Sequence, residues 1–176
     1  MQLICNYSEW LKLVDKESVF SLYEYRPTFI KPLLVQFEPI RMIRRFRFWK
    51  EMLSGGYRVY YLADGDTLVG YCVVAPGGRR LAISTKHDVV LGPYFVAPEH
   101  RGNGYAKVLV RMTLQSCSYN YKNAFDWIHK DNYASIKTTE ACGFVQEGHK
   151  LNVVGWTRKL VLDDNGSNVI YKYTRE

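Results

Sequence analysis

The sequence predicts an α/β (α+β) domain with a mixed, mostly antiparallel sheet that a helical crossover interrupts. Two segments rich in β-branched and aromatic residues, Tyr57–Ala63 and Thr67–Ala75, flank Asp64-Gly65-Asp66, whose residues are typical of a hairpin turn. From Gly102 onward, apolar residues recur at helical spacing directly after a strand. A length of 176 residues with 47% hydrophobic residues suits a single domain that folds alone.

The first 56 residues are the hardest part to interpret, because prolines at 27, 32 and 39 exclude long regular elements. We predict a short helix from a Ser8 cap through Val14 and an extended segment from Val19 to Tyr25. A helix then begins at Pro39 and ends at Gly55-Gly56. Its apolar positions at about helical spacing are Ile40, Ile43, Phe46 and Trp49, and its basic cluster is Arg41, Arg44, Arg45, Arg47 and Lys50.

Past the hairpin, strands and helices alternate. A turn at Gly77-Gly78-Arg79-Arg80 leads into a strand from Val89 to Val96, which Gly92-Pro93 interrupts. Proline has no N–H for a ladder, so the strand must bulge or lie at an edge there. The remaining predicted elements are a helix over 102–119, a strand over 123–129, a helix over 132–141 and closing strands over 144–154 and 169–174.

The charge balance favours an anionic partner. Lys and Arg number 24 against 17 Asp and Glu, which leaves a net charge of +7. An anionic partner for this charge could be a nucleotide cofactor, a phosphorylated substrate, a nucleic acid or a membrane. The four cysteines lie far apart and predict neither a metal site nor a disulfide framework, as expected of a cytoplasmic protein. No apolar run approaches the roughly 18 residues of a membrane span, so we expect no membrane association.

The most informative segment is the glycine-rich turn between the strand that ends near Val96 and the helix that follows. Backbone N–H groups at a helix start lack intrahelical acceptors and lie at the positive end of the helix dipole, so this turn can bind a pyrophosphate. Two common phosphate-binding motifs are absent. There is no Gly-x-x-x-x-Gly-Lys-Ser/Thr, and the dinucleotide fingerprint needs Gly or Ala where Lys107 stands.

The turn, Arg101-x-x-Gly104-x-Ala106, resembles motif A of the GNAT superfamily of acyl-CoA-dependent N-acetyltransferases, whose pattern is Arg/Gln-x-x-Gly-x-Gly/Ala. A second family element agrees: Asn132 and Ser135 open the next helix, and Gly143-Phe144 closes it. The resemblance, which covers Tyr57 to the C-terminus, implies a GNAT-like sheet with helices on both faces and a splayed central strand pair. It also implies one domain, 1–176, with an acetyl-CoA-binding core at 57–176 and a divergent acceptor-side section at 1–56.

The resemblance further implies where acetyl-CoA, the co-substrate, binds. Its pyrophosphate would rest on the amides of Arg101, Gly102, Asn103, Gly104, Tyr105 and Ala106. Its pantetheine would contact the main chain of Tyr94 and Val96. Asn132 and Ser135 would also contact the pantetheine arm, although Asn132 would cap a helix equally well.

The general acid and base are less defined. Many family members carry a tyrosine, the acid for the leaving thiolate, at the position of Thr139, whose alkyl hydroxyl is a poor acid. Water, Tyr133 or another of the 14 tyrosines could replace it. A base is needed because an amine attacks only when neutral, and the candidates are His87, Asp88 and His129.

The function that the resemblance implies is acetyl transfer to an amine by direct attack in a ternary complex. The acceptor stays open among antibiotic, amino-sugar, polyamine, amino-acid and protein N-terminal amines. The basic cluster favours an anionic acceptor, such as a phosphorylated amino sugar. One alternative is a non-catalytic CoA-binding sensor, which Thr139 favours. A second is a nucleic-acid-binding protein that uses the basic helix. A homodimer also stays open.

Overall fold

The computed structural model describes residues 3–35, 37, 42–53, 55–78, 81–154 and 159–175, without the side chains of 42–47 and 159. Its contacts form two compact units. The first comprises Met1–Ala75 and Pro93–Ser118, and the second comprises Pro76–Gly92 and Tyr119–Glu176. In the described part of the chain, no helix combines the length and the apolar character needed to cross a bilayer.

Nine strands are hydrogen-bonded in the order β1-β2-β3-β4-β5-β6-β9-β7-β8. The neighbours β1–β2, β2–β3, β3–β4, β6–β9, β7–β9 and β7–β8 are antiparallel, and β5–β6 is parallel. A parallel pair needs a crossover connection, and helix α2 lies in the one that joins β5 to β6. The predicted mixed, mostly antiparallel sheet is therefore confirmed.

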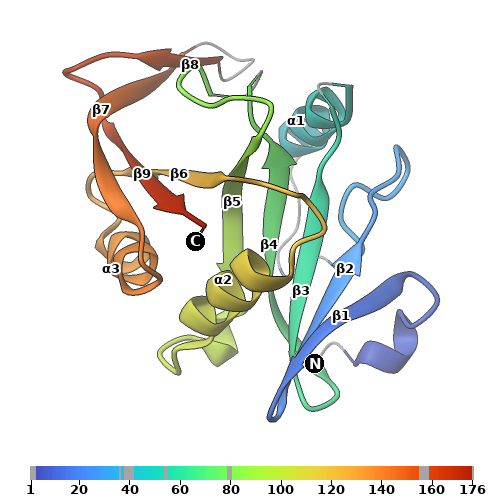
Figure 1. Ribbon diagram of the computed structural model, residues 1–176. Helices are drawn as coiled ribbons and strands as arrows, with labels where there is room; N and C mark the ends of the chain where they lie inside the picture. Colours follow the sequence, from blue (N-terminus) through green and yellow to red (C-terminus); the bar gives the residue numbers. More distant parts are fainter. Residues whose placement is uncertain are drawn as a thin grey trace. The chain divides into compact units, whose positions relative to one another are not determined.

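Among its described residues, the first unit has two α-helices, which lie on opposite faces of its strands (Figure 1). Successive strand residues point to opposite faces. Tyr60 bonds Ser118, just past the end of α2, whereas Tyr57, three positions earlier and so on the other face, packs against Phe48 of α1. The elements of this unit are a 3-10 helix Ile4–Asn6, β1 Leu11–Glu17, β2 Phe20–Tyr25, α1 Met42–Leu53, β3 Arg58–Asp64, β4 Thr67–Pro76, a 3-10 helix Pro98–His100 and α2 Tyr105–Ser116.

The predicted helix from Ser8 to Val14 is wrong. Residues Leu11–Glu17 form β1, which pairs along its length with β2, and the Ser8 hydroxyl donates to the carbonyl of Cys5. Local propensity is a weak guide where a long-range partner supplies a ladder. The predicted extension of Val19 to Tyr25 and the hairpin of β3 and β4 are confirmed.

Three tyrosine hydroxyls hold the main chain of the irregular segment that follows β2. Tyr25 donates to the Lys31 carbonyl at 2.6 Å, and Tyr57 donates to the Pro32 carbonyl at 2.8 Å. The Tyr61 hydroxyl accepts the N–H groups of residues 34 and 35 at 2.9 and 3.1 Å. The segment thus has a defined path without a ladder of its own.

The second unit consists of the first half of β5, strands β6, β7, β8 and β9, and helix α3. Phe125, Leu151 and Ile170 pack in its core on one face, while α3 covers the side of β6 that carries Asp126. The bounds are β5 Asp88–Val96, β6 Asn123–His129, α3 Tyr133–Ala141, β7 Val145–Val154, β8 Lys159–Leu162 and β9 Asn168–Thr174. All but β8 were predicted.

Strand β5 carries the predicted interruption at Gly92-Pro93 but is not an edge strand, since the strand order places it between β4 and β6. Its register with β6 runs only from Asp88–Asn123 to Val90–Phe125. Pro93 is exposed and lies three residues past the last pair of this register, where a missing N–H removes no bond of the β5–β6 ladder. Gly92 adopts φ +94°, in the left-handed region.

Candidate active site

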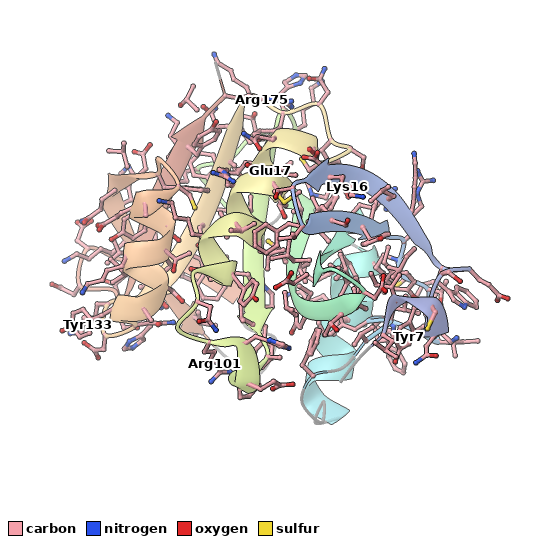
Figure 2. The ribbon with its side chains drawn as sticks, turned by 90° about the horizontal axis from the view of Figure 1, so that it is seen from below. Tyr7, Lys16, Glu17, Arg101, Tyr133 and Arg175 are labelled. Carbon is pink, nitrogen blue, oxygen red and sulfur yellow. The ribbon has the colours of Figure 1, made fainter. Side chains whose placement is uncertain are left out.

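The turn before α2 is built on two left-handed glycines. Gly102 has φ +85° and Gly104 has φ +77°, and open space surrounds the position of a side chain at both. A residue in that conformation cannot continue a right-handed helix, which is why α2 begins at Tyr105 and not at Gly102 as the periodicity predicted. Figure 2 shows Arg101 on this turn, beside the first turn of α2.

The turn presents a row of N–H groups. In the described residues, the backbone N–H groups of 102–106 have no protein acceptor, and the first intrahelical bonds are those of Lys107 and Val108 to the Gly104 carbonyl. Together with the partial positive charge of the helix start, roughly half an elementary charge, these donors form a site for an anion such as a pyrophosphate.

Side chains fix the turn to its surroundings. The Nε of Arg101 donates to the carbonyl of Val96 at 3.1 Å, and its guanidinium lies 5.1 Å from the centre of the Phe95 ring. The Tyr105 hydroxyl donates to Oδ2 of Asp64, the last residue of β3, at 2.5 Å. The predicted phosphate-binding turn is therefore tied both to the end of β5 and to the hairpin.

The end of β5 offers main-chain groups along one edge. A side chain at Gly70 of β4 would start 2.5 Å from the Phe95 carbonyl oxygen, so that carbonyl points at β4. Carbonyl direction alternates along a strand, and the carbonyls of Tyr94 and Val96 consequently point to the opposite edge of β5. Both residues are half-buried. The Val96 carbonyl already accepts the Nε of Arg101 at this edge.

The other predicted cofactor contacts lie at the start of α3, in the second unit. Asn132 caps this helix, because its side-chain oxygen accepts the N–H of Ser135 at 3.3 Å. Tyr133, the first residue of α3, is 68% exposed. His129, at the end of β6, accepts the N–H of Asp131 at Nδ1 and lies 3.5 Å from the Asp131 carboxylate. The structure thus gathers these exposed residues in one short stretch.

Asp88 is almost fully buried at the start of β5 and accepts four hydrogen bonds. The N–H and hydroxyl of Thr85 reach Oδ2, and the N–H and side-chain amide of Asn123 reach Oδ1. Burial raises the pKa of Asp88, but these bonds outweigh it and hold the pKa below its ordinary value. A carboxylate so satisfied is a weak base. The neighbouring His87 is exposed, and its carbonyl accepts the N–H of Lys122.

Sequence reasoning missed a buried acid on β6. Asp126 is 5% exposed, and within the described residues it has no ion-pair partner. Its Oδ1 accepts the N–H of Trp127 at 2.8 Å, and its Oδ2 accepts the hydroxyl of Thr139 at 3.2 Å. Burial raises the pKa of Asp126 to about 7, against the lowering effect of those two bonds. The signal in the sequence is an acidic residue among the apolar positions of β6.

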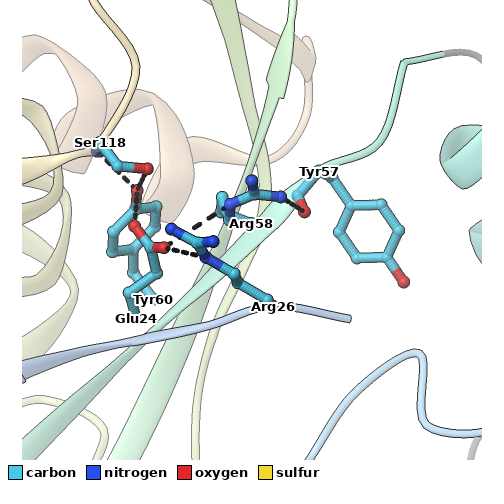
Figure 3. Close-up of polar contacts among 6 residues, drawn as sticks. All are labelled: Glu24, Arg26, Tyr57, Arg58, Tyr60 and Ser118. Atoms are coloured by element: carbon cyan, nitrogen blue, oxygen red, sulfur yellow. Dashed lines mark hydrogen bonds and ion pairs between the residues drawn. The ribbon is translucent and has the colours of Figure 1, made fainter. Parts of the chain in front are cut away.

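A second missed carboxylate, Glu24 of β2, lies in a polar cluster of the first unit (Figure 3). Tyr60 donates to its Oε2 at 3.0 Å, and Arg26 and Arg58 approach its Oε1 at 3.2 and 3.6 Å. Burial raises the pKa of Glu24, but bonds from Ser118, Tyr60 and Arg26 and the charge of Arg58 lower it further than burial raises it. The cluster joins β2, β3 and the end of α2.

The N-terminal section also reaches β4 and β5 through aromatic rings. Phe37 stacks on Tyr71 and Phe95 with ring centres 6.2 and 6.1 Å apart, and Tyr71 and Phe95 stack at 5.9 Å. All three rings are half-buried. The structure does not test the predicted basic cluster, because Arg41 and the side chains of Arg44, Arg45 and Arg47 lie outside the described residues. The remaining member, Lys50, is exposed.

The sequence matches the profile of the Acetyltransferase (GNAT) family over residues 22–144. The chain belongs to this family. The match begins in β2, so the GNAT likeness extends into the N-terminal section further than the two motifs alone indicated. As a GNAT acetyltransferase, the protein carries out acetyl-CoA-dependent acyl transfer of the N-acetyltransferase type. No curated protein sequence matches the chain closely enough to count as a relative.

Solved structures agree with the GNAT fold. The ribosomal L7/L12 alpha-N-protein acetyltransferase RimL in complex with coenzyme A is 13% identical with a TM-score of 0.60, over 93% of this chain and 98% of RimL. yncA, a putative acetyltransferase from Salmonella typhimurium with acetyl-CoA, is 16% identical with a TM-score of 0.53, over 87% and 93%. The ribosomal-protein-alanine N-acetyltransferase of Brucella melitensis is 15% identical with a TM-score of 0.55, over 86% and 99%.

Proposed function

We propose that this GNAT protein moves the acetyl group of acetyl-CoA to an amine by direct attack in a ternary complex. The main support is the row of N–H groups at 102–106, which offers the CoA pyrophosphate a site at the start of α2. The amine nitrogen attacks the thioester carbonyl, the C–S bond breaks with its electron pair on sulfur, and the nitrogen loses a proton to a base. No covalent enzyme intermediate is required.

The cofactor residues of the proposal are those of the turn and of β5. The N–H groups of the turn take the pyrophosphate, and the main chain of β5 at Tyr94 and Val96 takes the pantetheine amides. Asn132 and Ser135 remain proposed contacts of the pantetheine arm. Their mutual bond gives them a capping role as well.

The proposed base is His129, with Asp88 and Tyr133 as further candidates for proton transfer. His129 is exposed at the end of β6, and an imidazole can take a proton from an attacking amine. Asp88, with four donors on its two oxygens, holds a proton less readily than an ordinary carboxylate. Tyr133 reaches solvent at the start of α3 and would act through its phenolic hydroxyl.

The proposed acceptor is an anionic amine such as a phosphorylated amino sugar, because of the basic cluster of α1. The stacked rings of Phe37, Tyr71 and Phe95 support the assignment of the N-terminal section to the acceptor side, since they bring it onto β4 and β5. RimL, by its name, acts on a protein α-amine. A protein N-terminal amine is therefore the second acceptor class to test.

The experiment is a screen of amines with acetyl-CoA, read by release of free thiol. Phosphorylated and neutral amino sugars form one matched pair of acceptors, and peptides with free and blocked N-termini form another. Thiol release with the phosphorylated sugar alone supports the anionic acceptor. Acetyl-CoA binding without thiol release from any acceptor identifies a sensor, and salt-sensitive binding of nucleic acid without CoA binding contradicts the proposal altogether.

A further inference from the structure

Tyr105, the first residue of α2, is held by three contacts within the first unit. Its hydroxyl donates to Oδ2 of Asp64 at 2.5 Å. Its ring packs edge-on against Phe20 of β2 and His100 of the preceding 3-10 helix, with ring centres 5.9 Å apart in both pairs. The bond to Asp64 raises the pKa of Tyr105, so the phenol keeps the proton that it donates. The motif A pattern leaves this position unspecified, so the resemblance assigns its side chain no role.

Asp64 is a firmly held acceptor for this bond. It is the last residue of β3 and lies in register with both β2 and β4. The hairpin turn that follows it is fixed as well. The N–H of Gly65 donates to the Val19 carbonyl at 3.1 Å, and the Asp66 carbonyl accepts the N–H of Ile4 at 3.0 Å. The hydroxyl of Tyr105 is therefore anchored to the sheet itself.

The turn between β5 and α2 needs such anchors. Gly102 and Gly104 both adopt a left-handed φ, and open space surrounds the position of a side chain at both. Glycine loses more conformational freedom on ordering than any other residue, so a turn built on two of them is costly to hold in one form. Two side chains hold it from either side of the glycines. Arg101 donates to the Val96 carbonyl at 3.1 Å, and Tyr105 donates to Asp64.

We propose that Tyr105 and Asp64 are a positioning pair for the cofactor pyrophosphate. Their hydrogen bond holds the N–H groups of 102–106 in the conformation that binds the anion, before the cofactor arrives. This inference rests on the proposed function, which assigns the pyrophosphate to this turn, and it adds two side chains that the proposed function does not use. A site ordered in advance binds more tightly, because the cost of ordering is met on folding and not on binding.

Helix α2 does not depend on this bond for its place on the strands. Arg111 donates to the two carboxylate oxygens of Glu17 at 2.9 and 2.8 Å, and the Ser116 hydroxyl donates to Asp15. At 1.5 Å per residue, Ser116 lies roughly 16 Å along the helix from Tyr105. Loss of the Tyr105 hydroxyl therefore loosens the turn and leaves the body of α2 in place. Ser116→Ala removes an anchor of the same helix far from the turn, and it is the matched control.

The decisive variant is Tyr105→Phe, which keeps the ring with its two edge contacts and removes only the hydroxyl. We expect its acetyl-CoA Kd, measured by calorimetry, to rise about tenfold. Acetyl-pantetheine lacks the pyrophosphate, so its Kd should be the same in Tyr105→Phe and in wild type. Ser116→Ala should bind acetyl-CoA as wild type does.

Variants of Asp64 test whether the two residues act as one pair. Asp64→Ala should raise the acetyl-CoA Kd by the same factor as Tyr105→Phe, and the double variant should be no weaker than either, because all three lack the same bond. Asp64→Asn keeps an acceptor oxygen for the hydroxyl and should restore the wild-type Kd. A double variant whose Kd rises by the product of the two factors shows independent effects and rejects the pair.

The outcomes separate this inference from the proposed function. Folded Tyr105→Phe protein with the wild-type acetyl-CoA Kd overturns the positioning pair and leaves the cofactor site intact. A wild-type protein that binds no acetyl-CoA overturns both. A rise in Kd that acetyl-pantetheine or Ser116→Ala shares is a general loosening of α2 and also rejects the pair. If Tyr105→Phe does not fold, Asp64→Ala decides by the same two comparisons.

Discussion

Replacement of Asp126 by asparagine should make the protein more stable at alkaline pH, independently of any activity. In the folded chain the pKa of Asp126 is about 7, against an ordinary value of 3.8. The folded state therefore binds more protons than the unfolded state between about pH 4 and 7, and the stability contributed by this group falls as the pH rises through that window. A difference of about three pKa units corresponds to about 4 kcal/mol at pH 8.

Asparagine does not titrate, and its amide can still accept from Trp127 and donate to Thr139. Urea unfolding of both proteins at pH 5 and pH 8 measures the effect, and other groups cancel in the comparison because they titrate in both. Between pH 5 and pH 8, the free energy of unfolding of the variant should rise by about 2.6 kcal/mol relative to wild type, because the rest of the effect falls below pH 5. An equal difference at both pH values would show that the pKa of Asp126 is not raised.

Three further predictions concern the cofactor turn, the polar cluster and the acceptor. Gly104→Val should raise the acetyl-CoA Kd at least about tenfold, because the new side chain blocks backbone approach to the pyrophosphate. The control Gly65→Val, at another left-handed glycine, should leave the Kd unchanged. If calorimetry shows an unchanged Kd for Gly104→Val, the cofactor binds elsewhere. Glu24→Ala should lower the free energy of unfolding by about 1–3 kcal/mol because the Tyr60 hydroxyl loses a buried acceptor and Arg58 a close one, whereas Arg26, 70% exposed, stays solvated; an unchanged free energy of unfolding would rule out this role. Arg44→Ala or Arg45→Ala should raise the acceptor KM and reduce its salt dependence with the acetyl-CoA KM unchanged; if neither KM moves, these arginines do not contact the acceptor.

The elements that the sequence predicted correctly are those specified by local sequence signals. Asp64-Gly65-Asp66 specifies a hairpin turn, and Asn132 with Ser135 specifies a helix start. β1 was missed because hydrogen bonds to β2 make Leu11–Glu17 a strand, and the residues of that segment alone do not indicate this pairing. The start of α2 was set three residues too early, because apolar spacing says nothing of the left-handed glycines that delay it.

The same contrast between local signals and long-range contacts applies to the candidate site. Gly104 and Ala106 lie on a contiguous motif and were found with it, while the cluster of Glu24 and the pair of Asp126 and Thr139 join residues far apart in the chain. A carboxylate does not reveal from sequence whether it is buried. The pKa of Asp126 depends on the covering helix, and that of Asp88 depends on donors from Thr85 and from β6.

The three tyrosine hydroxyls that hold residues 31–35 bind only main-chain atoms of that segment. Its path depends on these bonds and on Leu33 and Val35, which are buried in the hydrophobic core of the first unit. The segment leads to Phe37, whose ring stacks over β4 and β5. Under the proposed function, replacement of the exposed Lys31 or the half-buried Phe37 would test whether this segment sets acceptor preference, because the bonds to the tyrosine hydroxyls leave the backbone in place.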